Sequence, residues 1–144
     1  ESAPLTREEV EKILKGDYAF LLYSPHSLCR EFYIECTCNM MRPRTIVDYE
    51  RIPWILDAGT VRITFDSDVR AAIGSYDIFD PGLPALSVLE PGKLILEVKF
   101  TEMLPQLLRD VLPPPAAEFT AVSKYVLCYE KTRYMNGFEY WYET

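Results

Sequence analysis

The chain of 144 residues has the size of one domain with one hydrophobic core, and its 49% apolar and 26% charged residues are typical of a globular protein. No apolar run approaches the roughly 18 residues of a membrane span, so we expect no span and a cytoplasmic location. The formal net charge of -7 argues against a general nucleic-acid binder, which carries a basic excess. Cations that bind an anion must therefore be gathered in one place.

The cysteines do not form a metal-binding pattern. The sequence has no C-x-x-C pair and a single histidine, His26, whereas zinc sites combine closely spaced cysteines with further cysteines or histidines. We interpret the four thiols as structural rather than metal-binding or redox-active. They are Cys29, Cys36, Cys38 and Cys128.

Helices are expected in residues 1–42. The stretch 6–15 begins with the spacing of a capping box, in which Thr6 and Glu9 each accept a hydrogen bond from the backbone of the other. Its acidic side chains are expected to face solvent. A second helix is predicted over 27–41, where the apolar spacing is looser.

Alternating patterns then predict two strands, over 45–55 and 60–67. Because proline cannot donate to a strand ladder, Pro53 indicates that the first strand ends near Ile52 or lies at a sheet edge. A short turn between the strands indicates an antiparallel hairpin. The polar face of the second strand carries Arg62, Thr64 and Asp66.

The remainder alternates between irregular and regular structure. Residues 69–91 are rich in Gly, Pro, Asp and Ser, which predicts a long irregular connection. Helical spacing of apolar residues predicts helices over 101–112 and 120–133, and Lys124 falls near the start of the second. The amino end of a helix favours anions. The tail 134–144 is aromatic and has no assignable pattern.

The stretch 93–100 (KLILEVKF) predicts a strand with two faces of different chemistry. We expect one face to pack in the core; it carries Leu94, Leu96, Val98 and Phe100. The other carries Ile95, Glu97 and Lys99. A carboxylate and an ammonium are costly to bury unless water, a metal or an anion meets them.

Five charged residues are candidates for one site: Arg51, Arg62, Glu97, Lys99 and Lys124. Taken singly, a charged residue on a strand is usually part of a solvated sheet face. If the strands close into a barrel, however, cations on the inward face would attract a strongly negative ligand. Arginine binds phosphate oxygens through its planar fork, and a carboxylate among cations is suited to hold the magnesium or manganese that accompanies polyphosphates.

The sequence resembles the C-terminal half of a bacterial VTC-type polyphosphate polymerase domain, a member of the triphosphate tunnel superfamily to which the CYTH triphosphatases also belong. Four blocks occur in the order of that family, and an opening segment, LTREEVEKILKGDY, fits as well. The blocks are IVDYERIPW (46–54), VRITFDSDVR (61–70), LEVKF with LPQLLRDVL (96–112) and SKYVLCYEK (123–131).

The resemblance implies an α+β fold, in which antiparallel strands form part of a triphosphate-tunnel-type barrel flanked by helices. It implies a single domain over 1–144, divided into a mostly helical connecting segment (1–42), tunnel strands with closing helices (43–133) and an aromatic tail (134–144). It also implies transfer of the γ-phosphoryl group of ATP to a growing polyphosphate chain, assisted by manganese or magnesium.

The site residues implied by the resemblance coincide with the five candidates. Arg51, Arg62 and Lys99 match phosphate-binding residues. Lys124, also expected to bind phosphate, matches a lysine on the helix that closes the tunnel. Glu97 matches the metal-binding acid. No protein nucleophile is needed, because cations and metal stabilise the transferring group.

Two other functions stay open, a CYTH-like triphosphatase that releases orthophosphate and a non-catalytic polyphosphate-binding module. Family members carry a further N-terminal half with additional tunnel strands. We therefore expect this chain to supply about half of the tunnel and to have weak or no polymerase activity alone. Self-association or an N-terminal partner segment could complete the barrel.

Overall fold

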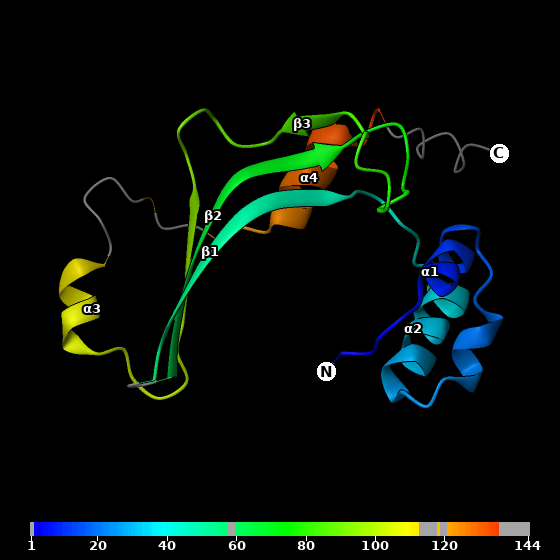
Figure 1. Cartoon of the computed structure of the whole chain (residues 1–144), viewed down its shortest axis with the longest axis horizontal. Coiled ribbons are helices and arrows are strands. Elements are labelled where there is room, and N and C mark those ends of the chain that lie inside the picture. Colours follow the sequence, from blue (N-terminus) through cyan, green and yellow to red (C-terminus); the bar gives the residue numbers. More distant parts are fainter. Residues whose placement is uncertain (1, 58–59, 113–117, 119–120, 136–144) are drawn as a thin grey trace.

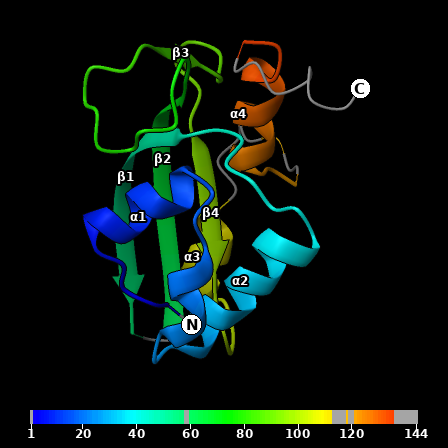
Figure 2. The same ribbon diagram turned by 90° about the vertical axis from the view of Figure 1, so that its right-hand side faces the viewer.

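The computed structural model describes residues 2–57, 60–112, 118 and 121–135. The N-terminal helices form one group, and the rest of the described chain is an antiparallel four-stranded sheet with two further helices (Figure 1). Figure 2 looks at the sheet from the side on which the N-terminal helices stand. The predicted α+β class is confirmed.

The N-terminal group packs around its own core. It contains α1 (Arg7–Leu14), the 3-10 helix η1 (Ala19–Tyr23) and α2 (Ser27–Cys38). The predicted capping box is present at Thr6, whose hydroxyl accepts from the Glu9 backbone while the Glu9 carboxylate accepts from the Thr6 backbone. The second helix ends three residues before the predicted Met41. The buried residues of this first core are Ile13, Tyr18, Leu21, Cys29 and Cys36.

The sheet is built around β2 (Val61–Ala72), which pairs with every other strand. Along one side it pairs antiparallel with β1 (Val47–Leu56), as the hairpin prediction required. Along the other side it pairs with β3 (Ala85–Ser87) at one end and with β4 (Ile95–Lys99) at the other. Among the described residues β1 pairs only with β2, so it is an edge strand and the described sheet is open rather than closed into a barrel.

Pro53 does not end β1, which continues to Leu56. Of the two expectations for this strand, the edge position is confirmed and the end near Ile52 is wrong. The reason is geometric, because a proline is tolerated in a strand when its missing N–H would face away from the partner strand. The hairpin turn at 58–59 lies outside the described residues.

A bulge changes the alternation in β2. Asp66 lies opposite Arg51, and Ala71 lies opposite Val47. On β2 the step from Asp66 to Ala71 is five positions, whereas on β1 the step from Val47 to Arg51 is only four. Asp68 has a φ of 48° at this point, which a short polar residue tolerates. Asp66 and Ala71 therefore share one face, and the prediction of an irregular connection from residue 69 is wrong for 69–72 and for β3.

A second core lies between the sheet and α4 (Lys124–Thr132). Its buried members are Val69, Ala71 and Cys128, and Ile95 of β4 packs against them. The expectation of one core is therefore wrong for the described residues, which bury two. Among the four free thiols, only Cys38 is exposed.

The two faces of β4 are not divided as expected. Leu94 and Phe100, assigned to the core, are 51% and 52% exposed, and Leu96 and Val98 are half-buried. The prediction of a core face is wrong because α4 lies on the opposite side of the sheet, the side to which Ile95 points. The hydrophobic core therefore shares a face with the charged candidates.

The two C-terminal helices are shorter than predicted. The one expected over 101–112 is α3 (Gln106–Val111), and α4 spans nine residues. Figure 1 shows α3 beyond one end of the sheet and α4 against the other. No helix in the described ranges is long and apolar enough to cross a membrane. The aromatic tail from residue 136 lies outside the described residues.

Candidate functional site

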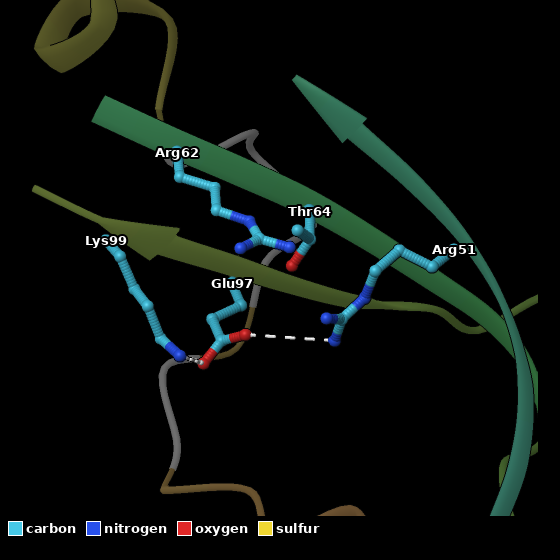
Figure 3. A pocket seen from close by; sticks show the side chains of 5 residues that line it. All are labelled: Arg51, Arg62, Thr64, Glu97 and Lys99. Carbon is cyan, nitrogen blue, oxygen red and sulfur yellow. Dashed lines mark ion pairs between the residues drawn. The ribbon is translucent and has the colours of Figure 1, made fainter. Parts of the chain in front are cut away.

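The strand register places four predicted residues in one hollow of the sheet (Figure 3). Arg62 lies opposite Lys99, and Thr64 lies opposite Glu97, so their side chains share a face. Arg51 reaches the same place from β1. The hollow has a volume of about 50 Å³.

Lys124, the fifth candidate, joins the site through Asp66. Its Nζ lies 2.7 Å from Asp66 Oδ2, and Arg51 grips the same carboxylate through Nε to Oδ1 at 2.6 Å and Nη2 to Oδ2 at 2.8 Å. Asp66 is fully buried. Charge-assisted hydrogen bonds of this kind are short and strong. Asp66 therefore holds two of the predicted cations in fixed positions.

The hydrogen bond from Arg51, with further support from Lys124, lowers the pKa of Asp66 from 3.8 to about 2. The same hydrogen bond raises the pKa of Arg51 above its ordinary value. Burial opposes ionisation of Asp66 but is outweighed. The carboxylate is thus ionised at neutral pH despite its burial.

Sequence reasoning missed Asp66. Alternation along the strand placed Asp66 on the same face as Arg62, and this was the available sign that it belongs to the site. Its importance depends on the β1–β2 register, which brings Arg51 opposite it, and on Lys124, which is 58 positions further along the chain. Alternation along one strand does not specify either relation.

Helix α4 is fixed to the sheet at several points. Ser123 caps its amino end by accepting from the Val126 backbone N–H at 3.3 Å, so Lys124 is the first helical residue. The prediction that Lys124 lies near the helix start is confirmed, although the helix begins four residues later than residue 120. The buried Cys128 donates its thiol to the Arg70 carbonyl at 3.5 Å. The ring of Tyr49 also lies 5.3 Å from Lys124 Nζ and 5.1 Å from Arg51 Cζ, a cation–π geometry for both.

Glu97 lies between two cations. Lys99 Nζ is 3.0 Å from Oε1, and Arg51 Nη2 is 4.0 Å from Oε2. The hydrogen bond from Lys99 lowers the pKa of Glu97, so the side chain is ionised at neutral pH. Because 36% of that side chain is exposed, a ligand can reach the carboxylate.

Arg62 differs from the other cations of the site. It is exposed, and its guanidinium has no hydrogen bond or ion pair within the described part of the chain. The site as a whole gathers four cations, Arg51, Arg62, Lys99 and Lys124, around two carboxylates. Its formal charge is therefore positive in a chain whose net charge is -7.

The residues present suit a metal that arrives with its own ligands. Within the described residues, no group of three or more His, Cys, Asp or Glu side chains could hold a metal ion. Both oxygens of Asp66 are engaged, which leaves Glu97 as the carboxylate of the hollow. Magnesium is usually held by one or two carboxylates together with substrate phosphates and water, and Glu97 fits that role.

Comparison with known proteins gives one family. A family model described as the VTC domain matches residues 1–133. The matched range extends from before α1 to the end of α4 and contains all five predicted site residues and Asp66. No curated protein and no solved structure matches the chain.

Proposed function

The chain belongs to the VTC domain family, and from this premise we propose that its sheet forms the phosphate-binding wall of a polyphosphate polymerase. The ligands are ATP and polyphosphate, bound over the hollow between β1, β2 and β4. The observation that carries the proposal is the concentration of four cations on one sheet face of an acidic chain. Such a face attracts a polyanion, whereas the rest of the acidic surface repels one.

The cations have different roles in binding. Arg62, which has no partner among the described residues, offers its whole guanidinium fork to non-bridging phosphate oxygens. Arg51 is oriented by Asp66 and keeps Nη1 without a partner in the described chain. Lys99 supplies a mobile point charge, because its side chain is 70% exposed. Lys124 is committed to Asp66 and mainly anchors α4 beside the ligand.

In the proposed reaction, a terminal oxygen of the polyphosphate chain attacks the γ-phosphorus of ATP. The bond from that phosphorus to the β–γ bridging oxygen breaks, and ADP leaves. The side chains contribute position and charge neutralisation rather than a nucleophile, as is usual in phosphoryl transfer. A divalent cation held by Glu97 and the phosphates would neutralise further charge on the transferring group.

Calorimetric titration of the chain with tripolyphosphate tests the binding step. Arg62→Ala should weaken binding about tenfold or more, because a charge-assisted hydrogen bond contributes roughly 1.5–3 kcal/mol. The variant should unfold like the unaltered chain, since Arg62 is exposed and has no side-chain partner among the described residues. Lys93→Ala is the control, because Lys93 is an exposed lysine paired with Glu90 outside the hollow. Equal affinity of both variants would contradict the proposal.

Product analysis separates the polymerase from the other functions. The chain is incubated with ATP and manganese, and the products are resolved on a gel and assayed for orthophosphate. A ladder of phosphate polymers supports the polymerase, whereas orthophosphate without chain growth assigns a triphosphatase. Tight binding of tripolyphosphate without turnover would assign a polyphosphate-binding module.

A further inference from the structure

One polar group in the hollow is unsatisfied. Thr64 of β2 is only 2% exposed, and its Oγ1 is buried without a hydrogen-bond partner in the described structure. The side chain nevertheless lines the hollow, where its oxygen points to the space between Arg51, Arg62 and Glu97 (Figure 3). A buried hydroxyl without a partner costs stability, so this position calls for an explanation.

The surrounding side chains do not accept a hydrogen bond from the hydroxyl. Arginine and lysine side chains carry only donors, which excludes Arg51, Arg62 and Lys99 as acceptors. Glu97 has acceptor oxygens, but neither accepts from Thr64 in the described structure; Oε1 accepts from Lys99 at 3.0 Å and Oε2 lies 4.0 Å from Arg51. The Thr64 hydroxyl therefore has neighbours that attract an anion and lacks an acceptor of its own.

We propose that the Thr64 hydroxyl donates a hydrogen bond to a non-bridging oxygen of a phosphate group held by Arg62 and Lys99. This inference rests on the proposed function and assigns a further ligand-contacting residue to the same site. A phosphate oxygen drawn in by the two cations supplies the missing acceptor. Threonine is suited to this position because its branched side chain fits a strand, as valine would, while its hydroxyl serves the ligand.

Thr64→Val tests the inference because it removes the hydroxyl and keeps the shape. In the free chain the variant should melt at the same temperature or higher, since an unsatisfied buried hydroxyl is replaced by a methyl group. Its affinity for tripolyphosphate should fall about tenfold, the effect of losing one hydrogen bond to a charged group. Thr64→Ser keeps the hydroxyl and should bind within about threefold of the unaltered chain.

Salt dependence separates this hydrogen bond from general electrostatic attraction. Because Thr64 carries no charge, Thr64→Val should weaken binding equally at low and high salt. Arg62→Ala should instead flatten the salt dependence, since salt screens the charge that it removes. A change of salt dependence in Thr64→Val would mean that the substitution had displaced the cations, and would overturn the inference.

The possible failures are distinguishable. Unchanged affinity in Thr64→Val, with Arg62→Ala weakened, overturns the role of Thr64 and leaves the proposed function intact. If Thr64→Val loses stability as well as affinity, Thr64→Ser decides, because recovered stability without recovered affinity assigns the hydroxyl to structure alone and overturns the inference. Absence of tripolyphosphate binding by the unaltered chain overturns both proposals.

Discussion

Replacement of Asp66 by asparagine should destabilise the fold, because Asp66 is the buried anion that joins β1, β2 and α4. Asp66 is fully buried, accepts hydrogen bonds from Arg51 and forms an ion pair with Lys124. Asp66→Asn keeps the shape and removes the charge. Arg51 and Lys124 would then face a neutral group, and α4 would lose its charged contact with the sheet.

The magnitude follows from the pKa of Asp66, which the fold lowers from 3.8 to about 2. At about 1.4 kcal/mol per pKa unit, this lowering corresponds to about 2 kcal/mol of folding free energy at neutral pH. Because the pKa is lowered in the folded state, the contribution is complete above the unfolded-state value near pH 4. It is lost progressively as the pH falls toward about 2.

Urea unfolding followed by far-ultraviolet circular dichroism measures this contribution. At pH 7 the free energy of unfolding of Asp66→Asn should be lower by about 2 kcal/mol, and the difference should shrink as the pH falls from about 4 to about 2. Asp68→Asn is the control, since Asp68 makes an exposed ion pair with Arg70 at 3.5 Å on the same strand. Its effect should stay below about 1 kcal/mol. A pH-independent difference, or equal effects of the two substitutions, would refute the reasoning.

Two further predictions concern the cations at the edge of the hollow. Lys99→Met should raise the pKa of Glu97 toward its ordinary value, because the Lys99 hydrogen bond is the main cause of its lowering; a carbon-detected NMR titration of the Glu97 carboxyl measures this, and an unchanged pKa would contradict the assignment. Arg62→Ala should reduce the loss of tripolyphosphate affinity between low and high salt, as measured by calorimetry at two ionic strengths. An unaltered salt dependence would place Arg62 outside the binding site.

Sequence patterns predicted structural features correctly where those features depend on residues close together in the chain. The capping box at Thr6 and the alternation in β2 and β4 were readable because they involve neighbours in the chain. Alternation alone placed Glu97 and Lys99 on one face, and the position of Arg51 as a charged residue within a strand added it to the candidates. The structure confirms that these side chains line one hollow.

Long-range relations were not available from the sequence. The bulge at Asp68 moves Val69 and Ala71 to the charged face, and one inserted residue in a strand is invisible to a periodicity of two. As a result, the core was assigned to the wrong face of β4. Asp66 was overlooked for a related reason. Its contacts with Arg51 and Lys124 depend on the β1–β2 register and on the position of α4.

The most direct test of the central claim is to map tripolyphosphate binding by amide NMR on the isotopically labelled chain. If this sheet face binds phosphate, resonances of β2 near Arg62 and Thr64 and of β4 near Glu97 should shift on titration. Resonances of the N-terminal core around Leu21 should stay unchanged, because that group of helices has a core of its own. Shifts gathered on α1 and α2, with β2 and β4 unaffected, would contradict the claim that this sheet face is the phosphate-binding wall.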